Sequence, residues 1–243
     1  EYADGMQVNM EWMSTRGVRW FDAPCHLCRR DTVDPSGLCP DCLAEWRALA
    51  GWSRCASCGL ALPAGAAGAT CGACAARPWP FGAVVTAVDL VPSVRELVHR
   101  LKYRQDFSVL PLLQETLRGA LSDIPPAALP DALVPMPLHP TQRRRRGFNQ
   151  AWLLADGLRH ALDRPLLGRG VRRVRDTRSL TAQTAPQRRR ALAGAFAVEP
   201  AVPRRVAIVD DVLTIGASAR ALAAELRRGG AESVAVWTLA RTP

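Results

Sequence analysis

The sequence predicts an α/β protein, a parallel sheet with helices on both faces, preceded by a small cysteine-rich domain. Three observations support this prediction. After residue 80, short apolar runs rich in β-branched residues alternate with amphipathic helical stretches, as is typical of parallel sheets. All eight cysteines lie at or before residue 74. The length of 243 residues allows one medium domain beside a small one.

Residues 1–24 form an N-terminal segment, and we expect part of it to be foreign to the natural protein. The segment carries charges and lacks the apolar stretch of a secretory signal. The chain has no run of roughly 18 or more apolar residues, the length that a membrane-spanning helix needs. These observations predict a cytoplasmic protein without membrane insertion.

The cysteines form four Cys-x-x-Cys pairs. Two residues between thiolates let both sulfurs reach one metal at about 2.3 Å, and two such pairs complete a tetrahedral site. Residues 25–76 are therefore predicted to be a double zinc ribbon with two structural Zn²⁺ sites, the alternatives being a single zinc or another metal. Pairing in sequence order is the simplest arrangement, and interleaved pairing stays open. The predicted ligands are Cys25, Cys28, Cys39, Cys42, Cys55, Cys58, Cys71 and Cys74.

The main domain is placed at residues 81–243, after a linker over 77–80. Its proline-rich stretch 135–140 follows a buried strand and therefore lies at the carboxyl edge of the sheet, where ligands bind in open α/β folds. The elements expected up to this point are a helix over 43–49, a strand over 81–90, helices over 92–103 and 109–121, and a strand over 132–134.

Basic residues gather in the next stretch. Four successive arginines, 143–146, cannot all face a core, and we expect 143–145 to form a mobile basic loop. A helix over 147–162 follows, whose N-terminus is a candidate anion site. Further cationic runs at 169–178 and 188–190 contribute to a formal net charge of +10, which suits a polyanionic partner.

The most informative stretch lies near the C-terminus. A strand over 206–209 is followed by Asp210 and Asp211, a hydroxyl-bearing turn over 214–218 and a helix over 219–228. Amides and hydroxyls at a helix N-terminus can hold a phosphate, and adjacent carboxylates can accept hydrogen bonds from vicinal sugar hydroxyls. An ordinary strand-turn-helix with a solvated Asp pair is the alternative. A final strand over 233–239 closes the domain.

The run from Val209 to Ser218 resembles the phosphoribosyl pyrophosphate (PRPP) motif of type I phosphoribosyltransferases. The segments 135–140 and 146–150 narrow the resemblance to the ComF family, and it covers the chain from about Cys25 onward. In this motif Ile215 replaces the usual second threonine and so removes one hydroxyl from the expected phosphate site. The resemblance implies a type I phosphoribosyltransferase-like fold.

The resemblance also implies roles for individual residues. Asp210 and Asp211 would hold the 2′ and 3′ hydroxyls of PRPP, which brings Mg²⁺ with it. The 5′-phosphate would lie on Thr214, Ile215, Gly216, Ala217 and Ser218, and the pyrophosphate side on Lys102, Arg146, Asn149 and His139. Lys102 is the only lysine of the chain, and a surface role for it is an equal alternative. For His139 a structural role is the alternative.

Two functions follow from these expectations. The first is transfer of the phosphoribosyl group to a nitrogen acceptor, for which the sequence names no base. The second is a non-catalytic factor in DNA uptake that binds single-stranded DNA and works with other competence proteins, and a PRPP sensor lies between the two. Fold alone does not choose between catalysis and binding. The tryptophans considered for stacking on bases, with burial as the alternative, are Trp46, Trp52, Trp79 and Trp152.

Overall fold

The structure is a computed structural model that describes residues 23–32, 34–63, 65–66, 69–176, 192–199 and 201–243. The chain divides into two compact units, 1–43 and 44–243. The predicted basic run 188–190 lies outside the described residues, as does the N-terminal segment up to residue 22. Among the helices that the structure describes, none is both long and apolar enough to cross a membrane.

In the first unit, a short hairpin carries the first cysteine pair. The amide of Cys25 donates to the carbonyl of Arg30 at 2.7 Å. Gly37 has φ +73°, and a Cβ atom there would lie 2.3 Å from Nε2 of His26, so only glycine permits this close approach. The elements of this unit are β1 (Ala23–Pro24), β2 (Asp31–Thr32) and the start of α2 (Pro40–Ala50), which continues into the second unit.

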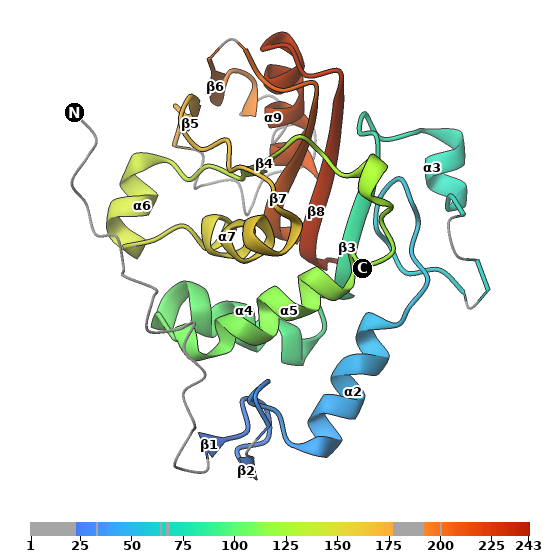
Figure 1. Cartoon of the computed structure of the whole chain (residues 1–243), viewed down its shortest axis with the longest axis vertical. Coiled ribbons are helices and arrows are strands. Elements are labelled where there is room, and N and C mark those ends of the chain that lie inside the picture. The colour runs from blue at the N-terminus through green and yellow to red at the C-terminus, as the bar shows by residue number, and fades with distance from the viewer. Residues whose placement is uncertain (1–22, 33, 64, 67–68, 177–191, 200) are drawn as a thin grey trace. The chain divides into compact units, whose positions relative to one another are not determined.

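The second unit is built on a four-stranded sheet whose neighbouring strands are all parallel (Figure 1). The strand order is β3, β8, β7, β4, so the strand that carries Asp210 and Asp211 lies inside the sheet. This arrangement confirms the α/β prediction. The strands are β3 (Val84–Asp89), β4 (Ala132–Pro135), β7 (Arg205–Leu213) and β8 (Ser233–Arg241).

The two faces of the sheet carry different helices. Val84, Val236 and Ile208 lie side by side in the register and share one buried cluster with Leu222 and Leu226 of α9 (Ala217–Arg228). Alternate strand residues point to the opposite face. There α5 contacts β3 and β8, and α7 contacts β4 and β7.

The remaining helices and strands connect these layers. α3 belongs to the region of the second cysteine cluster, and β5 and β6 form a separate antiparallel pair. Their bounds are α3 (Gly72–Ala76), α4 (Pro92–Arg104), η1 (Phe107–Val109), α5 (Leu110–Gly119), η2 (Pro126–Ala128), α6 (Pro140–Arg146), α7 (Gln150–Leu162), β5 (Val171–Arg173) and β6 (Phe196–Val198).

Two local expectations were wrong. The strand expected over 206–209 extends to Leu213, because its neighbour β8 continues to pair with it beyond Val209, with Asp210 opposite Thr238 and Leu213 opposite Arg241. The mobile loop expected over 143–145 is part of helix α6. His139 caps this helix by accepting from the amide of Thr141, and Gly147 ends it with φ +87°.

Candidate functional site

The eight cysteines form two quartets in sequence order, the simpler of the two pairings. Within each quartet the four sulfur atoms lie within 4.8 Å of one another. The sulfurs of Cys28 and Cys39 are 3.5 Å apart, and those of Cys58 and Cys71 are 3.8 Å apart. Metal–sulfur bonds of about 2.3 Å in a tetrahedron place sulfurs about 3.8 Å apart. Each quartet can therefore hold one metal ion in a closed site.

Both quartets contain a thiol that ionises readily. The side chain of Arg30 lowers the pKa of Cys28 to about 6. Burial opposes ionisation of Cys55, but the backbone amides of Cys71 and Ser57 bring the pKa of this thiol to about 6. Burial raises the pKa of Cys42 and Cys74. Because the thiolate is the form that binds a metal, binding should release protons from these two thiols.

Asp210 and Asp211 point to opposite faces of the sheet because they are consecutive residues of β7. Asp210 is half-buried and lines a pocket, and its Oδ1 accepts from the amide of Asp211 at 2.9 Å. Asp211 is 4% exposed and forms an ion pair with Lys102. The amide of Gln150 also donates to Oδ1 of Asp211 at 3.0 Å. The two carboxylates are therefore in different environments.

These environments shift the two pKa values apart. Burial, reinforced by the charge of Asp211, raises the pKa of Asp210 well above its usual range. Burial opposes ionisation of Asp211 as well, but the ammonium of Lys102 and the amide of Gln150 hold its pKa below the usual range. Asp211 therefore ionises first, and Asp210, which faces the pocket, keeps its proton to a higher pH.

The pocket has a volume of about 270 Å³ and lies at the end of β7. It is lined by Asp210, Leu192 and residues 212–219, so the turn expected to hold a phosphate forms its wall. Gly216, with φ +69°, stands at the N-cap of α9, and no side chain caps the first turn of this helix. The amides there are available to an anion.

The predicted pyrophosphate contacts have structural partners. Asn149 caps α7 through Oδ1, which accepts from Ala151 at 3.0 Å, while its Nδ2 donates to the carbonyl of Met136 at 3.0 Å. The guanidinium of Arg146 bonds to Oε1 of Gln150 and lies 5.6 Å from the ring centre of Tyr103.

A chain of polar contacts joins four elements on the α7 side of β7. It runs from Arg146 through Gln150 to Asp211 and Lys102, so two residues link Lys102 to Arg146. Sequence analysis missed Gln150, although this residue directly follows the helix cap. These polar contacts hold Asp211 in place on the α7 side of β7, whereas Asp210 lines the pocket on the other face.

Arg173 is a second residue that sequence analysis missed. Burial lowers the pKa of its guanidinium, and the nearby carboxylates of Asp210 and Asp176 oppose this shift. The guanidinium of Arg173 lies 5.5 Å from the ring centre of Phe196, the residue opposite it in the β5–β6 pair. In the sequence, the one signal for Arg173 was its position in the cationic run 169–178. The pairing of β5 with β6, which brings Arg173 near Asp210, cannot be recognised from neighbouring residues in the sequence.

The four candidate tryptophans separate into buried and exposed ones. Trp46 is 3% exposed and its Nε1 donates to Oγ1 of Thr116 at 2.8 Å, which makes it a core residue. Trp79 is half-buried beneath Arg220, whose guanidinium lies 4.4 Å from its ring centre. Trp52 and Trp152 are exposed.

Comparison with known proteins places the chain in a family, although no protein-family model matches it. It is 37% identical to the DNA utilization protein YhgH of Salmonella typhi over 225 residues, 90% of this chain and 96% of that protein. Identity to YhgH of Escherichia coli K12 is 34% over 224 residues, 90% of each chain. Competence protein F of Haemophilus influenzae is 32% identical over 232 residues, 92% of this chain and 99% of that protein. The chain therefore belongs to the ComF family.

Proposed function

We propose that the chain binds PRPP or a related ribose 5-phosphate, as a Mg²⁺ complex, in the pocket at the end of β7. The observation that carries the proposal is the combination of Asp210 and the uncapped N-terminus of α9 around one pocket. The amides of Ala217 and Ser218 would hold the 5′-phosphate together with the hydroxyl of Thr214. Asp210 would accept hydrogen bonds from the ribose hydroxyls.

Metal ions enter this proposal in two ways. Among the described residues that line the pocket, Asp210 is the one carboxylate, so the pocket offers few protein ligands to Mg²⁺. Mg²⁺ would therefore arrive bound to the pyrophosphate, whose oxygens are its preferred ligands. Zn²⁺ would occupy both quartets as a structural ion, since four thiolates leave no open coordination position.

All eight cysteines are free of disulfides, and thiols persist in a reducing compartment. We therefore propose that the protein works in the cytoplasm.

The reaction that such a site supports is phosphoribosyl transfer to a nitrogen nucleophile. The chain would contribute by holding the sugar and stabilising charge as pyrophosphate leaves, more than by proton abstraction. Asp210 has a raised pKa, so binding of Mg²⁺-PRPP that favours its ionised form should release a proton. Binding without turnover would make the protein a PRPP sensor.

Calorimetric titration of the metal-loaded chain with Mg²⁺-PRPP tests this proposal. Asp210→Asn should abolish binding, whereas Asp123→Asn, a matched change at an exposed carboxylate, should leave the affinity unchanged. Repeating the titration in buffers with different ionisation enthalpies measures the released proton. Absence of saturable binding by the unaltered chain would refute the proposal.

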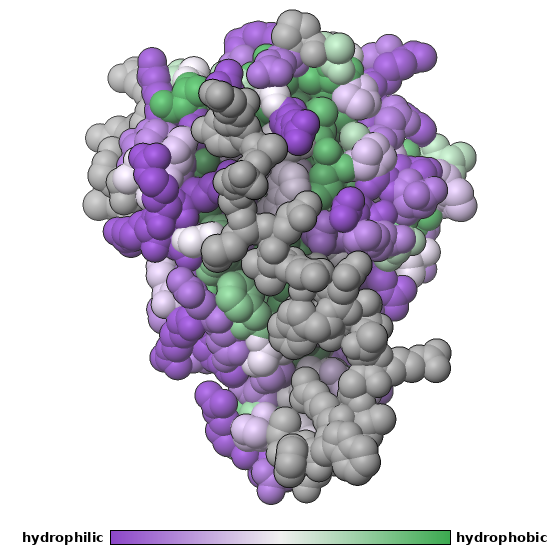
Figure 2. Space-filling model, turned by 60° about the vertical axis from the view of Figure 1, so that its left-hand side comes forward, coloured by the Kyte–Doolittle hydropathy of each residue, from purple (hydrophilic) through white to green (hydrophobic). Residues whose placement is uncertain are grey.

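A second candidate function, single-stranded DNA binding, is favoured by a particular surface. Tyr103 is 60% exposed and Phe107 41% exposed, and the ring of Phe107 meets that of Phe148 edge-on at 5.1 Å. Arg146 lies over Tyr103. We call these four residues the α4–α6 surface. Exposed arginines of α6 lie next to it in sequence. Outside the parts drawn in grey, Figure 2 shows hydrophilic and hydrophobic side chains next to one another on the face it presents.

Exposed rings beside arginines form the kind of surface on which unpaired bases stack. The relatives' names, DNA utilization protein and Competence protein F, agree with a DNA ligand. Fluorescence anisotropy with an oligothymidine should show salt-dependent binding that weakens about tenfold in the Tyr103→Ala/Phe107→Ala variant. Val174→Ala, a loss of an exposed apolar side chain outside this surface, is the control. Equal affinities of both variants would exclude this surface.

A further inference from the structure

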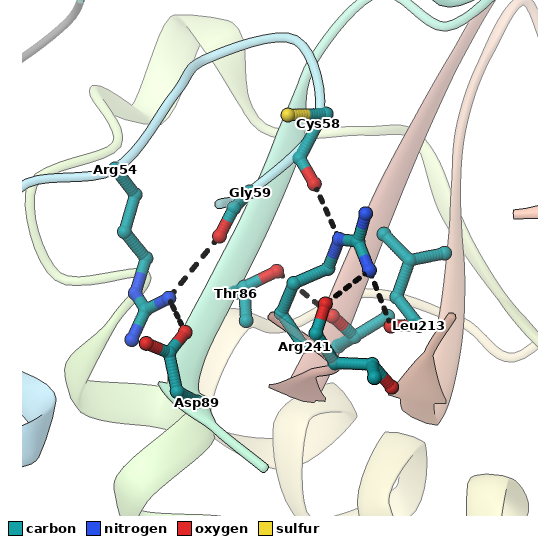
Figure 3. A network of polar contacts seen from close by, with 9 residues as sticks. Arg54, Cys58, Gly59, Thr86, Asp89, Leu213 and Arg241 are labelled. Atoms are coloured by element: carbon teal, nitrogen blue, oxygen red, sulfur yellow. Dashed lines mark hydrogen bonds and ion pairs between the residues drawn. The ribbon is translucent and has the colours of Figure 1, made fainter. Parts of the chain in front are cut away.

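The second cysteine quartet is attached to the edge of the sheet (Figure 3). The amide of Val84 in β3 donates to the carbonyl of Ala56 at 2.9 Å. Gly59 has φ +73°, and a Cβ atom there would lie 2.3 Å from Oγ1 of Thr86. The backbone of the third cysteine pair therefore lies directly against β3, within the same compact unit as the pocket.

Arg54 fixes one side of this attachment. Its Nη1 donates to Oδ1 of Asp89 at 2.7 Å and to the carbonyl of Gly59 at 3.1 Å. Both charged side chains are nearly buried, with exposed fractions of 10% and 7%. A buried, hydrogen-bonded ion pair of this kind holds one geometry, because any displacement leaves a charge without its partner.

Arg241, the last residue of β8, connects the quartet to the pocket. Its Nε donates to the carbonyl of the metal-site residue Cys58 at 3.0 Å, and its Nη1 donates to the carbonyl of Leu213 at 3.2 Å. Leu213 ends β7 and is the residue from which the turn 214–218 departs. One buried guanidinium thus joins the cysteine cluster to the entrance of the proposed phosphate site (Figure 3).

Trp79 forms a second connection. It follows the fourth cysteine pair and packs against both the cysteine cluster and the core cluster beneath α9. A Cβ atom on Gly216 would lie 2.3 Å from Cζ3 of Trp79, so the indole ring supports the N-cap of α9. Arg220 and Arg241 lie 4.4 and 5.6 Å from the centre of this ring.

We propose that metal at the second quartet sets the conformation of the turn 214–218, with Arg241 and Trp79 as the positioning residues. A bound metal fixes the backbone of Cys55–Cys58 and so the carbonyl that receives Arg241. Without metal, this carbonyl and the indole lose their fixed positions, and the amides at the start of α9 lose theirs. The affinity of the pocket for a phosphorylated sugar then depends on metal occupancy. This last step rests on the proposed function, whereas the conformational link does not.

Hydrogen–deuterium exchange of the full chain tests the link without any ligand. Cys55→Ser/Cys58→Ser should remove one metal per chain and speed exchange over 213–219 about tenfold. The matched control, Cys25→Ser/Cys28→Ser in the other compact unit, should also lose one metal and leave exchange over 213–219 unchanged. Unchanged exchange there in the first variant, or acceleration spread equally over β3 and β8, would overturn the inference.

Three further variants retain all the metal ligands. In Arg241→Lys, the lysine lacks the planar guanidinium that donates to the carbonyls of both Cys58 and Leu213. This variant should therefore bind Mg²⁺-PRPP about tenfold more weakly while both metals stay bound. Trp79→Ala should have a similar effect, and Trp79→Phe should recover part of the affinity by keeping a ring against Gly216. If the unaltered chain binds no PRPP, the proposed function fails and exchange over 213–219 in these variants still decides the inference. Full affinity and unchanged exchange in both Arg241→Lys and Trp79→Ala would refute it.

Discussion

Replacing Lys102 by methionine tests the polar network behind β7. The change removes the ammonium and keeps a side chain of similar shape, so Asp211 would remain buried without its charge partner. The side chains of Lys102 and Asp211 are only 19% and 6% exposed. Removing one member of a buried ion pair costs about 3 to 5 kcal/mol, because the remaining charge cannot return to water.

The expected loss lies at the lower end of this range. Gln150 would still donate to Asp211, and Lys102 is partly open to solvent, so we expect the free energy of unfolding to fall by about 3 kcal/mol. Asp211→Asn should cost less, about 1 to 2 kcal/mol, since the long lysine side chain can reach water. The double variant should be less destabilised than the sum of the two single changes.

Urea denaturation of these three variants and the unaltered chain gives the coupling free energy directly. Arg118→Met, which breaks the exposed pair with Glu115, is the control and should cost less than about 1 kcal/mol. A loss below about 1 kcal/mol for Lys102→Met, or strictly additive single changes, would show that the ion pair does not hold Asp211 in place.

Three further predictions concern the pocket and the metal sites. Burial and Asp211 raise the folded-state pKa of Asp210, so its contribution to stability is fully present below its ordinary pKa and lost as pH rises through the raised value. Asp210→Asn should therefore gain stability relative to the unaltered chain as pH rises through that range, which urea denaturation at several pH values would show; a pH-independent difference would contradict the shift. Gly216→Ala should lower the unfolding free energy by about 2 kcal/mol, because the residue adopts φ +69° and its new methyl group would meet Trp79; calorimetry that finds equal melting temperatures would refute this contact. When the purified chain is denatured in the presence of a colorimetric zinc indicator, the indicator should report two ions per chain. A chelator should lower the melting temperature of the folded chain, because metal affinity contributes to folding. Release of one ion per chain would mean that only one quartet is a zinc site.

Local sequence patterns determined the four cysteine pairs and the alternation of strands and helices. Spacing alone indicates that Cys55 and Cys58 share a metal, because two intervening residues bring the sulfurs together regardless of the rest of the fold. The apolar, β-branched run before Asp210 likewise predicts a buried strand, and the following glycine-containing turn predicts a helix start. Such signals depend on neighbours in the chain, which the sequence displays directly.

The tertiary structure alone decided which polar groups meet. The extension of β7 to Leu213 depends on pairing with β8, and it separates Asp210 and Asp211 onto opposite faces of the sheet. The contact between Arg241 and Cys58 joins residues 183 positions apart. No local pattern encodes such a contact, because it exists only after the sheet has brought distant segments together. The cysteine pairs could be predicted for this reason, whereas their grouping into quartets and the connection of the second quartet to the pocket could not.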